Sequence, residues 1–114
     1  MTQDSSSRQQ PHKIVHQGLR VDHDEGRGRY SLWHGSTYIG FIGFYREGDV
    51  VTLQHTIVNE EFGRRGYARA LSTLVLDELR AQGLKIVPEC SYIADYLHRY
   101  PEYQDMVASW PAQD

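Results

Sequence analysis

The feature that most constrains this 114-residue chain is a change in the spacing of its apolar residues at one glycine- and arginine-rich turn. Before the turn, β-branched and aromatic residues recur with the character of strands. After it, apolar residues recur at the spacing of one helical face, at Leu71, Leu74, Val75 and Leu79. Residues 60–71 read EEFGRRGYARAL and join the two regions. The chain is therefore expected to run from a strand through this turn directly into a helix.

The turn places cations at a helix N-terminus, where acidic side chains are usual. The first N–H groups of a helix have no partner within it, and the helix dipole adds about half a positive charge, so anions bind there. Arg64, Arg65 and Arg69 crowd this turn, and the first turn of the predicted helix holds no acidic residue. We expect an external anion here. The alternative is that Glu60 and Glu61 neutralise the arginines on a solvated surface.

Length and composition predict one small domain around this turn. The chain is long enough for a single core without metal or disulfide staples, over residues 13–108. Residues 1–12 are polar and Ser/Gln-rich, so we expect a disordered tail there, and residues 109–114 have no periodic pattern and form a C-terminal tail. A net charge of −3 gives no basic footprint for nucleic acid.

Cysteine usage and hydropathy predict the compartment. Cys90 is the single cysteine, so no internal disulfide can form. No segment resembles a signal peptide, and no apolar run has the length of a transmembrane helix. We therefore expect a soluble protein in the reducing cytoplasm, without a membrane partner.

The predicted elements form an α+β (mixed α/β) order. Turn signals such as Gly48 separate strand-like segments, expected at residues 19–21, 29–34, 37–46 and 50–58 as an antiparallel meander. Gly83 is suited to end the following helix as its C′ residue. Residues 84–87 then predict a buried strand parallel to residues 50–58, because a helix connects the two.

A second helix is expected after Pro88 ends that strand. It covers residues 91–99 with Ser91 as its N-cap, since serine is favoured at that position. Pro101 begins a last helical turn that carries apolar side chains at Tyr103, Met106 and Val107.

This order of elements, with the glycine turn, resembles the GNAT superfamily of acetyl-CoA-dependent N-acetyltransferases. Its signature, Gln/Arg-x-x-Gly-x-Gly/Ala, lies between the fourth strand and the following helix, where residues 63–68 read GRRGYA. Gly63 stands where Gln or Arg is usual, which removes a side chain but no backbone donor. Further matches to the small stand-alone, YjdJ-type branch, whose N-terminal half is trimmed, lie at residues 54–58 (QHTIV), 87–92 (VPECSY) and 99–103 (RYPEY).

The resemblance implies a GNAT-like fold, in which the antiparallel meander is joined by a parallel pair that splays at the centre of the sheet. It also implies acetyl-CoA as cosubstrate, with the pantetheine arm along the strand before the turn and the pyrophosphate on the N–H groups of the turn. Glycine at position 66 lets the backbone approach the phosphates, and the arginines can add charge-assisted contacts. The expected cofactor-binding residues are Ile57, Val58, Gly63, Arg64, Arg65, Gly66, Tyr67, Ala68 and Arg69.

Acetyl transfer needs a base for the amine and a proton donor for the departing thiolate. Cys90, at the expected start of the second helix, could be a nucleophile or an acid–base group, or a buried inert thiol. His55 shares a strand face with Ile57 and could act through a water as a general base, or be a hydrogen-bonded core residue. A tyrosine from the last main helix commonly protonates the thiolate in the superfamily, so Tyr92 and Tyr96 are candidates, with core aromatics as the alternative.

Two functions are consistent with these sequence features. The first is an N-acetyltransferase that moves acetyl from acetyl-CoA to a primary amine by direct attack, assisted by Cys90 and His55, with a small molecule, peptide or protein lysine as acceptor. The second is a CoA-binding or protein-interaction module with little catalysis, because the helices trimmed from this branch usually build the acceptor site. The remaining histidines lack metal-ligand spacing, so no metal is expected. No Gly-x-Ser-x-Gly motif occurs, so a serine hydrolase is not expected either.

Overall fold

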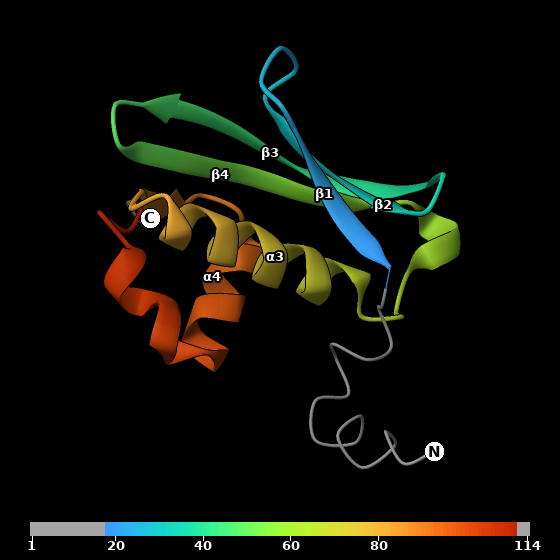
Figure 1. Cartoon of the computed structure of the whole chain (residues 1–114). Coiled ribbons are helices and arrows are strands. Elements are labelled where there is room, and N and C mark those ends of the chain that lie inside the picture. Colours follow the sequence, from blue (N-terminus) through green and yellow to red (C-terminus); the bar gives the residue numbers. More distant parts are fainter. Residues whose placement is uncertain (1–17, 112–114) are drawn as a thin grey trace, which may run out of the picture.

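The computed structural model describes residues 18–111, which form one twisted sheet with helices packed on a single face (Figure 1). Neighbouring strands follow chain order, and only the last pair is parallel. The α+β fold, with an antiparallel meander and a parallel pair, is therefore confirmed. The tail predicted at residues 1–12 lies outside the described residues. The strands are β1 (Leu19–Asp24), β2 (Arg29–His34), β3 (Thr37–Glu47), β4 (Val50–Val58) and β5 (Lys85–Pro88).

The helices follow β4 and β5, as predicted. Their bounds are η1 (Glu60–Phe62), α3 (Tyr67–Ala81), α4 (Ser91–Arg99) and η2 (Pro101–Met106), where η marks 3₁₀ helices. Gly83 ends α3 with a φ of 74°, and its N–H donates to the Arg80 carbonyl at 3.0 Å. The N–H of Leu84 donates to the Leu79 carbonyl at 3.0 Å, which completes a Schellman motif. The predicted role of Gly83 is confirmed.

The buried face of α3 is rotated from the predicted one. Leu74 was expected on the apolar face but is 37% exposed, whereas Ser72, a polar residue outside that predicted face, is fully buried. The Ser72 hydroxyl donates to the Ala68 carbonyl at 2.8 Å, so its burial leaves no unpaired donor. Leu76, which the predicted face did not include, is buried together with Leu71, Val75 and Leu79.

The start of α4 also differs by one residue from the prediction. Cys90 is the N-cap, with an extended backbone at φ −76° and ψ 127°, and Ser91 is the first helical residue. No side-chain hydrogen bond caps this end. The prediction of Ser91 as N-cap is therefore wrong, because the helical backbone already begins at Ser91 and the extended N-cap position falls one residue earlier, on Cys90.

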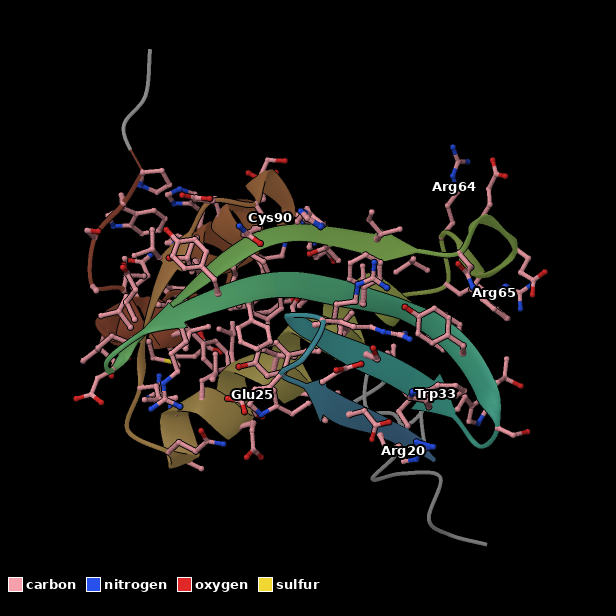
Figure 2. The ribbon with its side chains drawn as sticks, turned by 90° about the horizontal axis from the view of Figure 1, so that it is seen from above. Arg20, Glu25, Trp33, Arg64, Arg65 and Cys90 are labelled. Atoms are coloured by element: carbon pink, nitrogen blue, oxygen red, sulfur yellow. The ribbon has the colours of Figure 1, made fainter. Side chains whose placement is uncertain are left out.

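The core lies between the sheet and the two α-helices. Both α3 and α4 pack on the same face, and within residues 18–111 no helix covers the other face (Figure 1). Figure 2 looks onto this uncovered face, where the Arg20 guanidinium lies over the Trp33 ring. Fully buried core residues include Leu32, Ile39, Ile42, Leu53, Leu71, Leu76, Leu79, Ile93 and Leu97.

A β-bulge in β4 decides which of its side chains face the helices. Gly43 of β3 pairs with His55 and the next residue, Phe44, pairs with Leu53, so Gln54 is an extra residue in β4. The bulge reverses the alternation of side chains along the strand. Leu53 and Thr56, three positions apart, therefore both face the helices.

β4 also separates from β5 at this point. The parallel ladder joins residues 50–53 to Lys85–Pro88 and extends no further. Residues 54–58 of β4 thus have no neighbouring strand on the β5 side within the described chain. This is the splay that the resemblance implied.

The rotation of α3 gives a paired stability prediction. Leu76→Ala should lower the free energy of unfolding by about 2–5 kcal/mol, because it removes a fully buried side chain and leaves a cavity. Leu74→Ala on the same helix should change it by only about 0.5 kcal/mol, because Leu74 is partly exposed. Urea denaturation followed by circular dichroism measures both. Equal losses in the two variants would contradict this orientation of α3.

Tyr30 gives a pH-dependence prediction. Its ring stacks on Phe44 with centroids 4.4 Å apart, and burial raises the pKa of Tyr30 from 10.0 to about 12. The unfolded chain releases this proton first, so the contribution of neutral Tyr30 is full below pH 10.0 and declines as pH approaches about 12. In urea unfolding across that range, Tyr30→Phe should lose less stability than the wild type. Parallel losses in the two proteins would refute this role.

Candidate functional site

The glycine turn joins η1 to α3 through left-handed backbone positions. Gly66 is the N-cap of α3 with φ 84° and ψ 7°, and Arg64 has a φ of 63°, which is uncommon for a residue with a side chain. A left-handed residue followed by a helical one aims successive N–H groups into one concavity, a nest that suits an anion. No side chain caps this end of α3. The backbone of the turn therefore has the form of an anion site.

The arginines of the turn are not neutralised by ion pairs. Within the described part of the chain, no salt bridge involves Arg64 or Arg65. Glu60 and Glu61 are exposed in η1, and the Arg64 side chain extends away from the turn (Figure 2). The positive charge of the turn is thus available to a ligand, and neutralisation by the two glutamates finds no support in these contacts.

A cavity of about 210 Å³ opens at the turn. Tyr92 of α4 and Phe62 of η1 complete its wall. Two of the expected cofactor-binding residues are not part of it: Arg65 is exposed, and Ile57 is half-exposed on the uncovered sheet face. The expected residues that line it are Val58, Gly63, Arg64, Gly66, Tyr67, Ala68 and Arg69.

Arg69 carries an unsatisfied donor at this cavity. Its Nε is buried and has no hydrogen-bond partner among residues 18–111. Burying an N–H group without a hydrogen-bond partner costs about 1–3 kcal/mol of stability, and more when the group is charged. A hydrogen bond to an anionic oxygen would remove this cost most effectively. This atom fits a phosphate group independently of the backbone of the turn.

Cys90 lies where β4 and β5 separate, beside β4 (Figure 2). Its side chain is buried, with Sγ 3.3 Å from Thr56 Oγ1, and its N–H donates to the Leu53 carbonyl at 3.0 Å. Thr56 was not among the predicted site residues. The motif at residues 54–58 contains it, but only the bulge at Gln54 turns it toward Cys90.

His55 lies on the other face of the sheet. Side chains of consecutive strand residues point to opposite faces, so the contact between Thr56 and Cys90 directs His55 away from Cys90. The His55 ring meets Phe41 edge-on with centroids 5.8 Å apart, and a Cβ at Gly43 would lie 2.8 Å from His55 Nε2. His55 shares its face with Ile57, as predicted, but the structure does not bring it together with Cys90.

Tyr92 and Tyr96 have different surroundings although they lie one turn apart on α4. Tyr92 is 38% exposed at the cavity, and burial raises its pKa while the nearby Arg69 opposes that rise. Tyr96 is buried, and its hydroxyl shares a hydrogen bond of 2.5 Å with Thr73 Oγ1. Burial raises the pKa of Tyr96 too, partly offset by this bond. Tyr92 is thus exposed to a ligand, whereas Tyr96 joins α4 to α3.

Residues 18–111 contain neither a metal-binding cluster nor a membrane-spanning helix. No cluster of three or more His, Cys, Asp or Glu side chains could hold a metal ion there. No helix in the same range combines the length and the apolar character needed to cross a membrane.

Comparison with known proteins identifies the family. Residues 29–106 match the family model of the GCN5-related N-acetyltransferase domain. The chain belongs to the GNAT superfamily. Protein NATD1 of Mus musculus is 30% identical to this GNAT chain over 95 residues, covering 80% of it and 86% of the mouse protein. Protein NATD1 of Xenopus tropicalis is 31% identical over 85 residues, covering 73% and 78% respectively.

A solved structure has the same GNAT fold. The NMR solution structure of a GCN5-like protein from Staphylococcus aureus matches this chain with a TM-score of 0.59 and 21% identity. The match covers 86% of this chain and 93% of that one. This match supports the fold, and the family model over residues 29–106 confirms the predicted superfamily. Membership of its small stand-alone, YjdJ-type branch stays a prediction.

The two tyrosines give a matched test of this geometry. Tyr96→Phe should lower the free energy of unfolding by about 1 kcal/mol, because it removes the hydrogen bond to Thr73. Tyr92→Phe should stay within about 0.5 kcal/mol of the wild type. Chemical denaturation measures both, and a larger loss in Tyr92→Phe would contradict the assignment of Tyr96 as the structural residue.

Proposed function

We propose that this GNAT chain transfers the acetyl group of acetyl-CoA to a primary amine. The main support for this proposal is the cavity at the start of α3, which is lined by the left-handed Gly66 and by Arg69, whose Nε has no partner among the described residues. A pyrophosphate supplies the anionic oxygens that this N–H nest and guanidinium lack. The family assignment supports acetyl-CoA as the compound that brings this pyrophosphate.

The free edge of β4 suits the pantetheine arm. Among residues 18–111, residues 54–58 have no strand partner on the β5 side, and the two amides of pantetheine can bond to their backbone as an added strand would. From the pyrophosphate at the turn, the arm would pass Val58 and Tyr92 and end near Thr56 and Cys90. The thioester is thus proposed to lie where β4 leaves β5.

The transfer itself is proposed to be direct. The amine nitrogen bonds to the thioester carbon, the C–S bond breaks, and the CoA thiolate takes up a proton. Cys90, held by Thr56 at the end of this path, is the proposed proton donor. His55 faces the uncovered side of the sheet, so an amine that approaches from that side can lose its proton to it through a water. Tyr92 and Tyr96 are then binding and structural residues.

A second candidate function is favoured by one observation. Within residues 18–111 no element covers the face on which His55 lies, so no walled acceptor pocket surrounds it. An acetyl-CoA-binding module with little turnover would have this architecture.

We also propose a cytoplasmic location. The proposed enzymatic role of Cys90 needs a reduced thiol, and the cytoplasm keeps thiols reduced.

Isothermal titration calorimetry with acetyl-CoA and CoA tests the cosubstrate site. Arg69→Gln should weaken binding about tenfold or more, because it removes a charge-assisted bond to phosphate. Arg46→Gln is the matched control, since Arg46 is exposed beside the β3–β4 turn at the other end of β4 (Figure 1). It should bind as the wild type does. A wild-type protein that binds neither ligand would overturn the proposal.

Release of free CoA thiol with a panel of polyamines, peptide N-termini and lysine peptides tests catalysis. Cys90→Ala should lower kcat by roughly a hundredfold, and His55→Gln should flatten the rise of kcat/KM with pH near neutrality. Tyr92→Phe should keep kcat close to the wild type. An acetylated Cys90 seen by mass spectrometry would replace direct transfer by a covalent route. Binding without turnover on any amine would favour the second candidate.

A further inference from the structure

A cavity of about 330 Å³ lies on the uncovered face of the sheet, over β1, β2 and the start of β3. Arg29, Ser31 and Trp33 line it and alternate along β2 with the buried Tyr30 and Leu32, so the three share this face. None of its lining residues belongs to the cavity at the glycine turn. The cavity is therefore separate from the proposed cosubstrate site, on the side from which the acceptor amine is proposed to approach.

Trp33 brings an unsatisfied donor to this cavity. Its Nε1 is buried and has no hydrogen-bond partner among residues 18–111. The Arg20 guanidinium lies 5.4 Å from the Trp33 ring centroid, and the Tyr38 ring meets it edge-on with centroids 5.2 Å apart (Figure 2). The ring thus packs against side chains from both adjoining strands. A carbonyl oxygen is the simplest partner for such an N–H group, because it accepts a hydrogen bond and brings no donor of its own.

The charged groups around the cavity leave one carboxylate without a partner. Arg27 Nε lies 3.8 Å from Asp24 Oδ2, and the Arg29 guanidinium stacks on Phe41. Within the described chain, neither a salt bridge nor a hydrogen bond involves the side chain of Asp22, which also lines the cavity. The cavity therefore offers an unpartnered N–H donor and an unpaired carboxylate. This combination suits a ligand that carries both a carbonyl oxygen and a positive charge.

The spacing of the strands favours a peptide over a small amine. His55 lies on the same face in β4, two strands away from β2. Neighbouring strands are about 4.8 Å apart, so the two places are about 10 Å apart or more. A diamine as short as a lysine side chain does not cover this distance, whereas about three residues of extended peptide do. A longer polyamine covers it too but has no carbonyl oxygen for Trp33 Nε1.

We propose that this cavity binds a basic peptide segment of the acceptor, next to the lysine that is acetylated. A peptide carbonyl accepts the hydrogen bond from Trp33 Nε1, and an arginine or lysine about three positions from the acceptor lysine pairs with Asp22. The inference rests on the proposed function, which brings the reacting amine to His55 on the same face. The substrate class is then a lysine in a basic segment of a peptide or protein.

A pair of peptides tests this by NMR of ¹⁵N-labelled protein, without acetyl-CoA. Each peptide carries one lysine, and three positions from it one peptide has arginine and the other glutamate. The chain has two tryptophans, and Trp110 stacks on His98 of α4, so Trp110→Phe assigns the two indole N–H signals. The arginine peptide should shift the Trp33 signal and not that of Trp110. It should bind about fivefold more tightly than the glutamate peptide, as expected for one exposed ion pair.

Two aspartate variants locate the charge that selects the peptide. Asp22→Asn should bind the two peptides equally, because the carboxylate that prefers arginine over glutamate is gone. Asp22 is exposed, so the backbone amide spectrum should otherwise stay that of the wild type. Asp49→Asn is the matched control, since Asp49 is an exposed aspartate in the β3–β4 turn, and it should keep the full preference.

The outcomes separate this inference from the proposed function. Equal wild-type affinity for the two peptides, or binding that leaves the Trp33 signal in place, would overturn the peptide site while acetyl-CoA binding at the turn stands. A full preference in Asp22→Asn would also overturn it. Spermidine that shifts the Trp33 signal at the same concentration as the arginine peptide would replace the peptide by a polyamine. A protein that prefers the arginine peptide but binds neither CoA nor acetyl-CoA would overturn the proposed function, and with it the acceptor role of the cavity.

Discussion

The separation of β4 from β5 at Leu53 is the constraint on which the site depends. The N–H groups of Glu89 and Cys90 both donate to the Leu53 carbonyl, at 3.0 Å each, so the ladder ends there and the chain turns into α4. Beyond this point residues 54–58 keep a backbone edge that no other strand of the described chain pairs with. Cys90 lies at one end of this edge and the glycine turn follows the other end. A ligand that extends along the edge therefore meets both.

The bulge at Gln54 then assigns the side chains of β4 to the two sides of the sheet. Without an extra residue, Leu53, His55 and Ile57 would share the helix-covered face, and a histidine and a large apolar group would enter the region near Cys90. With it, Thr56 takes that place and bonds to Cys90. One residue of backbone thus decides which groups a ligand on the helix side can contact.

Local pattern was sufficient for the order of the strands and for the glycine turn, because each depends on neighbouring residues. It missed some bounds: β1 continues to Asp24, beyond the predicted residues 19–21, and β5 is Lys85–Pro88 and not 84–87. The bounds of β4 and the role of Gly83 follow from alternation and from one left-handed position. The periodicity of α3 defined an apolar arc but not the centre of its buried face. Leu74 was therefore expected to be buried and is partly exposed, and the burial of Ser72 was not foreseen. The contact of Thr56 with Cys90 joins residues 34 apart in sequence and depends on the bulge, for which residues 50–58 carry no signal.

On the uncovered face, a glycine in β3 leaves space for the His55 ring. Gly43, opposite His55 in β3, has no side chain, and a Cβ there would lie 2.8 Å from His55 Nε2. The imidazole therefore rests over the β3 backbone and against Phe41, on which the Arg29 guanidinium stacks at 4.0 Å from the ring centroid. Any larger residue at position 43 would push the ring off the sheet. The proposed cosubstrate path lies on the helix face, so the proposed base, His55, lies on the face left open for the proposed acceptor amine. The place where β4 separates from β5 is where the two substrates would meet.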